Sequence, residues 1–205
     1  MYKKRRYAKK RMVVNRALQP IPQRYICKMK YSADVSTSST GQYLFNLNSV
    51  FDPDRTGIGH QPYGHDTLSL LYNRYRVISC GWRITAPTSL STIIQLGALP
   101  SNEVVPIVSM DYIRENPRAK YHCQMPGGNC LVLSGKSHLP SLVGRTSQQY
   151  MADDRYQAQV GTSPSELAIL NLFTATATGA PLAAPINIVL EYTVEWFDVI
   201  NVAQS

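Results

Sequence analysis

The sequence predicts an all-β fold: a single eight-stranded antiparallel jelly roll of two packed four-stranded sheets, with short loop helices and a disordered basic N-terminal arm. Three observations predict this fold class. Apolar side chains recur at every second position in most apolar segments, which is typical of strands with one buried face. Strands and helices do not alternate along the chain, so we expect antiparallel sheets. Long, uneven connections favour a jelly roll over an up-and-down barrel.

The arm carries the whole net charge of the chain. Residues 1–16 contain eight Lys or Arg and no Asp or Glu, while the full chain has 21 basic and 13 acidic residues and a formal charge of +8. Like charges at this density cannot pack together, so we expect the arm to stay solvated until it meets a polyanion. The eight cations are Lys3, Lys4, Arg5, Arg6, Lys9, Lys10, Arg11 and Arg16.

Tyr2 and Tyr7 lie among these cations, where their rings could stack on unpaired bases while the cations contact phosphates. We therefore interpret the arm, with both tyrosines, as a nucleic-acid-binding segment. A solubility tail is a weaker interpretation, and a nuclear-import signal is compatible with nucleic-acid binding. A mitochondrial presequence would contain Ser, which this run lacks, and a secretory signal would need a longer apolar segment than residues 12–14.

The sequence divides into residues 1–22, the basic arm and a linker stiffened by two prolines, and residues 23–205, which have the size of one domain. Only 17% of the chain is charged, below the roughly 25% of average domains, and such a surface suits packing against neighbouring copies. No apolar run reaches the roughly 18 residues that cross a membrane, so no membrane insertion is expected. The four cysteines are expected to be reduced thiols.

The first predicted strand, residues 24–32, alternates a core face with a basic face. Tyr25, Cys27, Met29 and Tyr31 form the core face. The last predicted strand, residues 186–199, alternates in the same way, with Tyr192 and Trp196 on its apolar face. Further strands are predicted at residues 42–48, 74–85, 91–99, 120–124, 130–136 and 166–176.

Short helices are predicted at residues 67–73, capped by Asp66, and after Ser109 up to residue 115. Adjacent glycines between residues 120–124 and 130–136 favour a β-hairpin at that point. Residues 137–164 show no pattern that assigns them to a strand or a helix.

Residues 51–66 form a long predicted loop, because three glycines and two prolines exclude regular structure there. Loops of this length within one domain are usually functional or interfacial. The sequence shows no partner for the loop's charged and imidazole groups inside the chain, so we expect the loop to pack against a neighbouring subunit. The candidate contact residues are Asp52, Asp54, Arg55, His60 and His65.

Catalytic and metal sites are poorly supported. Asp52 and Asp54 resemble a carboxylate pair, but a loop aspartate most often caps a turn; an inter-subunit contact comes next, and calcium binding or catalysis last. His60 and His65 do not match a zinc pattern. The chain lacks a phosphate-loop motif and a Gly-x-Ser-x-Gly motif. We therefore expect no enzyme activity, no metal and no cofactor.

Residues 51–77, FDPDRTGIGHQPYGHDTLSLLYNRYRV, resemble a segment of capsid proteins from circovirus-like viruses, which have circular single-stranded DNA and encode a replication initiator. The order of basic arm, short strand, loop with helix and Tyr-Arg-Val strand is similar too, and residues 126–129 and 161–166 match more loosely. The resemblance implies a jelly roll, an icosahedral shell of about sixty copies and an arm that lies inside against the genome. This arm is shorter and richer in Lys than the Arg-rich arms of circoviruses proper.

The resemblance also implies the partners of the chain: a single-stranded DNA genome, host nuclear-import machinery and a host cell-surface receptor, with the protein in the virion and in the host nucleus during assembly. Sixty such arms would match on the order of 500 phosphates, so other basic residues and small cations would neutralise the rest of a genome. The alternative function is a soluble single-stranded nucleic-acid-binding β-domain with a basic tail. Such a domain would gather basic and aromatic residues on its folded surface.

The strand pattern also predicts one cross-strand contact. Neighbouring first and last strands in a jelly roll would bring Lys28 or Lys30 close to Glu191 or Glu195, each pair contributing about 0.2–1 kcal/mol. The arm leaves from the first strand, so we expect Arg24, Lys28 and Lys30 to face the interior of the particle.

Overall fold

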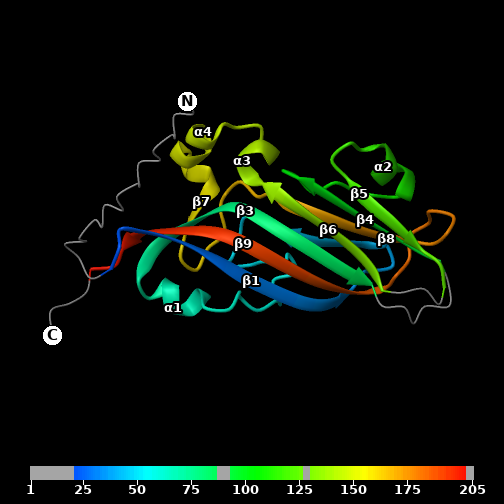
Figure 1. Ribbon diagram of the computed structural model, residues 1–205, viewed down its shortest axis with the longest axis horizontal. Coiled ribbons are helices and arrows are strands. Elements are labelled where there is room, and N and C mark those ends of the chain that lie inside the picture. Colours follow the sequence, from blue (N-terminus) through cyan, green and yellow to red (C-terminus); the bar gives the residue numbers. More distant parts are fainter. Residues whose placement is uncertain (1–20, 87–92, 127–129, 202–205) are drawn as a thin grey trace, which may run out of the picture.

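The computed structural model describes residues 21–86, 93–126 and 130–201. Two antiparallel sheets pack against each other in a jelly-roll-like fold (Figure 1). The first sheet has the order β1-β9-β3-β6, with the short β7 also paired to β3, and the second has the order β2-β8-β4-β5. The strands of the first sheet are β1 (Arg24–Ser36), β9 (Pro185–Val199), β3 (Tyr72–Ala86), β6 (Leu131–His138) and β7 (Gln157–Gln159). Those of the second are β2 (Gln42–Asn46), β8 (Ile169–Ala175), β4 (Ile94–Ser101) and β5 (Lys120–Gln124).

The described residues contain nine strands, whereas the sequence predicted eight in two four-stranded sheets. The additional strand is β7, which widens the first sheet to five strands. It lies in the segment 137–164 that showed no pattern, because a three-residue strand is too short to display a period. The same segment holds α3 (Leu139–Leu142), α4 (Ser147–Ala152) and the 3-10 helix η1 (Asp154–Tyr156).

The predicted hairpin is wrong. β5 pairs with β4 in the second sheet, while β6 pairs with β3 in the first, so the chain changes sheets between them. Glycines in a connection allow either a hairpin or a change of sheet. Here β6 joins the first sheet, and its apolar side chains Leu131 and Leu133 are buried in the core. Residues 127–129, where the hairpin turn was predicted, lie outside the described residues.

The two loop helices are close to their predicted positions. α1 is His65–Ser69, shorter than predicted and displaced towards the N-terminus; its N-cap is Gly64 in a left-handed conformation, so the predicted Asp66 cap is wrong. Pairing of Tyr72 with Val199 draws the chain into β3 and ends the helical stretch early. α2 is Met110–Glu115 and begins after Ser109, although the Ser109 side chain makes no capping hydrogen bond.

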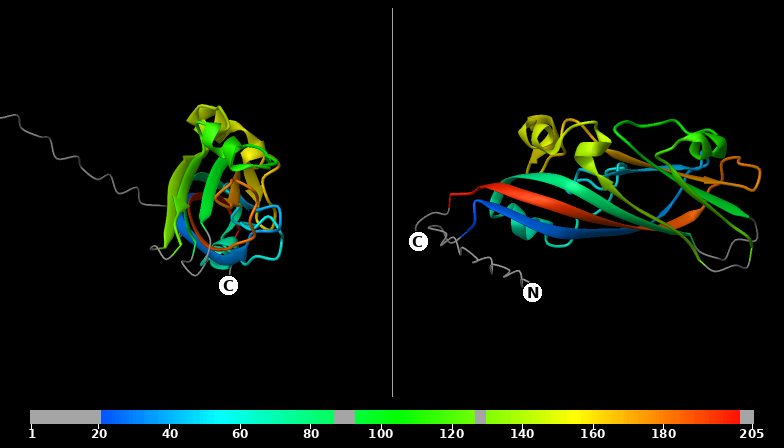
Figure 2. Two further views of the ribbon diagram at one scale, coloured as in Figure 1. Left: turned by 90° about the vertical axis from the view of Figure 1, so that its right-hand side faces the viewer. Right: turned by 45° about the horizontal axis from the view of Figure 1, so that its top comes forward.

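The core lies between the two sheets and is rich in aromatic rings. Trp196 is fully buried and packs against Tyr72 and Tyr75, with ring centroids 6.5 and 5.6 Å away. The hydroxyl of Tyr192 donates to the Asn46 carbonyl at 2.7 Å, which joins the two sheets across the core. Figure 2 shows the helices α2, α3 and α4 along one side of the sheets, with α1 on the other side. No helix in the described ranges is long and apolar enough to cross a membrane.

Candidate functional site

The first and last strands are neighbours, as predicted, and their outward face is charged. Lys30 lies directly opposite Glu191 in the β1–β9 register. The Lys28 ammonium donates to Glu191 Oε1 at 2.6 Å, and Lys30 Nζ lies 3.7 Å from Oε2. The predicted lysine–glutamate contact is therefore confirmed. Both lysines are 70% exposed, so each pair contributes only about 0–1 kcal/mol to stability.

The two lysines keep Glu191 ionised. The hydrogen bond from Lys28, aided by the charges of Lys28 and Lys30, lowers the pKa of Glu191 below its ordinary value. Since the carboxylate is shared by both ammonium groups, it neutralises part of the positive charge on β1. This face remains a predicted inner surface of a particle, with Arg24, Lys28 and Lys30 as its cations.

Glu195 lies further along the same face but is buried. Its side chain is 4% exposed and lies between Arg24, 3.4 Å from Oε1, and Arg76, 3.7 Å from Oε2. Arg76 is itself 6% exposed and also donates to Gln157 Oε1 at 3.1 Å. Burial lowers the pKa of the Arg76 guanidinium, and the Glu195 carboxylate opposes that shift.

The sequence placed Glu195 on a polar, solvent-facing side of its strand, and that expectation is corrected by its burial. Met151 and Gln157, which come from the unassigned segment, both contact Arg76 and cover this part of the sheet. The sequence signal that could have revealed the pair is Arg76 itself. That signal is weak, because β3 also contains Arg74 and Arg83, and only a buried arginine needs a partner.

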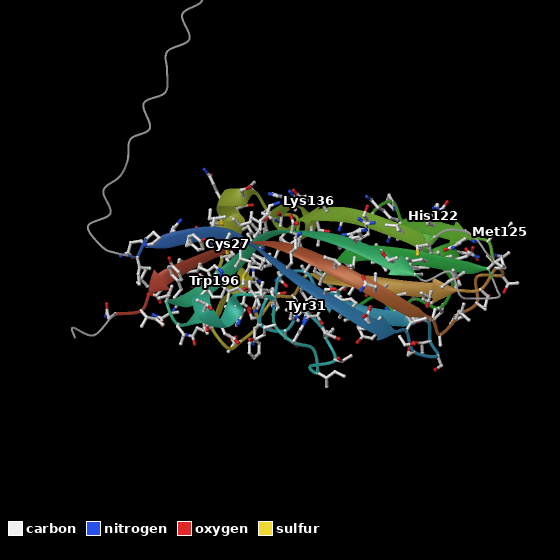
Figure 3. All side chains as sticks on the ribbon, turned by 60° about the horizontal axis from the view of Figure 1, so that its bottom comes forward. Cys27, Tyr31, His122, Met125, Lys136 and Trp196 are labelled. Atoms are coloured by element: carbon white, nitrogen blue, oxygen red, sulfur yellow. The ribbon has the colours of Figure 1, made fainter. Side chains whose placement is uncertain are left out.

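The predicted core face of β1 is buried at the centre of the strand but not at its start. Met29 and Tyr31 are buried, Met29 directly opposite Tyr192. Cys27 is half-buried and Tyr25 is 43% exposed. The start of β1 thus runs past the edge of the core, next to the basic arm (Figure 3 labels Cys27, Tyr31 and Trp196).

The loop at residues 51–66 is held to the domain by Asp54. This carboxylate is 3% exposed and accepts hydrogen bonds from the Thr56 backbone N–H at 3.0 Å, the Thr56 hydroxyl at 2.9 Å and the Tyr43 hydroxyl at 2.9 Å. Gly59 lies so close that a Cβ there would meet Asp54 Cβ at 2.7 Å. The interpretation of Asp54 as a turn-capping aspartate is therefore confirmed, whereas the expectation that the loop's charged groups lack a partner within the chain is wrong for this residue.

The loop histidines have neighbours within the chain as well. His65 is 3% exposed, its Nδ1 lies 3.2 Å from Asp66 Oδ1, and its ring packs edge-on against Trp196 at 5.7 Å between centroids. His60 is exposed but packs against the Tyr31 ring at 4.7 Å. A contact role with a neighbouring copy is thus proposed for His60 and not for the buried His65.

The rest of the loop offers an exposed, partly apolar surface. Ile58 is 87% exposed, Tyr63 is 95% exposed and Arg55 is exposed. Asp52 is half-buried. Its pKa is raised mainly by burial and, to a smaller extent, by the nearby charge of Asp54. Asp52, Arg55 and His60 therefore remain the predicted contact residues.

Asp54→Ala is expected to lower the free energy of unfolding by about 1–3 kcal/mol, because the Tyr43 hydroxyl and the Thr56 N–H lose their acceptor. Urea unfolding followed by circular dichroism measures this change. Arg55→Ala is the matched control in the same turn and should change stability by less than about 0.5 kcal/mol. Equal stability of Asp54→Ala and wild type would show that the turn does not depend on this carboxylate.

The predicted nucleic-acid-binding residues of the arm lie outside the described residues, and their role remains a prediction from the sequence. They are Tyr2, Lys3, Lys4, Arg5, Arg6, Tyr7, Lys9, Lys10, Arg11 and Arg16. In the ranges that the structure describes, no three His, Cys, Asp or Glu side chains gather to hold a metal ion.

Comparison with known proteins gives a likeness of fold. No protein-family model matches the chain, and no curated protein matches its sequence. A chain of the nora virus structure matches with a TM-score of 0.51 and 13% identity over 90% of this chain and 64% of its own length. Desmodium yellow mottle tymovirus matches with a TM-score of 0.49 and 10% identity, over 94% of this chain and 99% of its own.

A chain of the semi-empty virus-like particle of giant freshwater prawn Macrobrachium rosenbergii nodavirus matches with a TM-score of 0.49 and 12% identity, over 92% of this chain and all of its own. The sequence identities are low, so these likenesses concern the fold. The two packed antiparallel sheets of this chain thus form a jelly-roll-like fold that it shares with a chain of the nora virus structure.

Proposed function

We propose that this chain is a capsid protein that self-assembles into a closed icosahedral shell of about sixty subunits and packages nucleic acid through its basic arm. The observation that carries the proposal is the jelly-roll-like fold shared with a virus structure, joined to an arm that holds the whole net charge. A body without net charge and with a cationic extension suits a container, because the body can pack against its copies while the arm neutralises the contents.

The arm enters the domain at β1, whose outward face carries Arg24, Lys28 and Lys30. Because the arm continues directly into β1, an arm that lies inside the particle supports an inward orientation of this face. The loop at residues 51–66 presents Ile58 and Tyr63 to solvent, and exposed apolar side chains of this size favour burial in a subunit contact. The role is structural, without a catalytic step.

Single-stranded DNA as the packaged genome is proposed on the resemblance of residues 51–77 to circovirus-like capsid proteins. The same resemblance underlies the proposed host nuclear-import machinery and cell-surface receptor, and a location in the virion and, during assembly, in the host nucleus. The arm's cations would serve both import and packaging, because both depend on Lys and Arg clusters.

The alternative, a soluble single-stranded nucleic-acid-binding domain, is less well supported. Such a domain stacks bases on aromatic rings within a basic groove. The exposed tyrosines of the described residues are instead dispersed over β1, the 51–66 loop, α2 and β5; they are Tyr25, Tyr63, Tyr112 and Tyr121.

The purified chain should sediment as a closed particle, with about sixty copies or a multiple as icosahedral symmetry requires. Analytical ultracentrifugation with negative-stain electron microscopy measures this. Packing of the low-charge surfaces and exposed loops is the expected driving force. A monomer that persists at every salt concentration and pH would contradict the proposal and favour the soluble binding domain.

A further inference from the structure

The outward face of the first sheet can be mapped from its register, because residues directly opposite each other on antiparallel strands share a face. Three successive rows cross the four main strands in the order β1, β9, β3, β6. They are Lys28–Thr193–Ser79–His138, Lys30–Glu191–Gly81–Lys136 and Ser32–Val189–Arg83–Ser134. A hydrogen bond of 3.2 Å between the Ser79 and Thr193 hydroxyl groups confirms that these two strands present the same face.

These rows contain four cations and one carboxylate, Glu191. Lys28 and Lys30 share that carboxylate. Arg83 and Lys136 are exposed and, among the residues that the structure describes, have no carboxylate within 4.0 Å. The β3–β6 half of the face therefore carries two unpaired positive charges.

Beside Arg83 the surface is hollow over Gly81, which has no side chain. The hollow has a volume of about 650 Å³ and is lined by residues that include Lys30, Arg83, Val189 and Glu191. A Cβ at Gly81 would lie at an ordinary contact distance, 3.8 Å, from Glu191 Cβ, so a methyl group would fit there without a clash. Lys136, labelled in Figure 3, lies directly opposite Gly81 on β6.

We propose that Arg83 and Lys136 form a phosphate-binding site for single-stranded nucleic acid on the folded domain. Arg83 lies opposite Ser134, two residues from Lys136, so the two cations are diagonal neighbours about 7–8 Å apart at their Cα atoms. One extended strand can contact both. Guanidinium and ammonium groups are the phosphate ligands that proteins use most, and neither group here is occupied by an acid.

This inference rests on the proposed function, and it accounts for a shortage of charge in the arm. Each arm has eight cations, and β1 carries the chain from the arm onto this same face. A strand bound by the arm would therefore meet the hollow next. Glu191 limits the attraction by holding Lys28 and Lys30. Contacts to phosphates carry no sequence information, so packing through this face would be sequence-tolerant.

The test is the salt dependence of binding of a fluorescent oligodeoxythymidine to unassembled full-length subunits, diluted below the concentration at which shells form so that this face is accessible. Fluorescence anisotropy measures the binding. Each phosphate contact on a single strand contributes roughly −0.7 to the slope of log K against log salt. Arg83→Ala/Lys136→Ala should therefore make the slope shallower by about 1.4. Glu191→Gln should make it steeper by up to about 1.4, because it releases Lys28 and Lys30.

The matched control is Arg118→Ala/Arg145→Ala, which removes the same charge from exposed positions outside the three rows and should leave the slope unchanged. Thermal unfolding checks that each variant is folded. Equal slopes for the two double variants would overturn the site while leaving binding by the arm intact. Absence of binding by wild type would overturn the proposed function itself. Intact particles can also be tested for binding to immobilised heparin. If that binding depends on Arg83 and Lys136, the face lies on the outside of the shell and the inference is overturned.

Discussion

Removal of residues 1–16 is expected to abolish most nucleic-acid binding and to leave a folded domain. The eight cations of the arm predict a contribution of about −6 to the slope of log K against log salt, at roughly −0.7 for each cation. Binding through the arm alone should therefore weaken by roughly four-thousandfold between about 50 and 200 mM salt. Anisotropy titrations of unassembled subunits with an oligonucleotide measure both quantities.

A full-length variant with all eight arm cations replaced by Gln is the matched control, because it keeps the length of the arm. It should behave like the truncated chain if charge is the cause, and both should retain only the shallow slope of the sheet face. The absorbance ratio at 260 and 280 nm of purified particles gives a second measure. An unchanged nucleic-acid content in the truncated protein would show that the contents are held elsewhere.

Glu195→Ala is expected to cause the largest loss of stability among single charge changes in the first sheet, about 3–5 kcal/mol. The substitution leaves the Arg76 guanidinium, 6% exposed, without its carboxylate in a low-dielectric site. Guanidinium chloride unfolding measures the loss. Glu191→Ala is the comparison, because Glu191 lies on the same strand but is 36% exposed. This substitution should lower the free energy of unfolding by less than about 1 kcal/mol.

A double variant distinguishes an unpaired charge from lost packing. Arg76→Met/Glu195→Leu removes both charges and should recover most of the stability lost in Glu195→Ala, since apolar pairs often replace buried ion pairs without cost. A similar loss for Glu195→Ala and Glu191→Ala would show that the Arg76–Glu195 pair is solvated in the folded protein.

The strands with a clear period of two could be predicted from the sequence. Alternation over residues 186–199 placed Tyr192 and Trp196 in the core, and both are fully buried. The same alternation, with the expected pairing of the first and last strands, predicted a contact of Lys28 or Lys30 with Glu191 or Glu195. In the structure Lys28 and Glu191 form it. A local pattern was sufficient because each of these strands has one apolar and one polar face.

Apart from the pairing of the first and last strands, which the jelly roll implies, features that depend on non-local pairing could not be predicted. The sequence predicts a hairpin at the glycine-containing connection before β6, which would place Lys136 beside β5, whereas the structure places Lys136 beside Gly81 and Arg83. The neighbouring cations Arg83 and Lys136 could therefore not be predicted. Burial of Glu195 was missed because its cover, including Gln157, comes from a segment without a periodic pattern.

The central claim is that this chain forms a shell whose charged sheet face meets the contents. A three-dimensional reconstruction of the purified particle by electron cryomicroscopy tests it most directly. The account predicts a closed shell in which Lys28, Lys30, Arg83 and Lys136 line the inner wall, with nucleic-acid density against β3 and β6. A shell with these four side chains on its outer surface, or a preparation without particles, would contradict it.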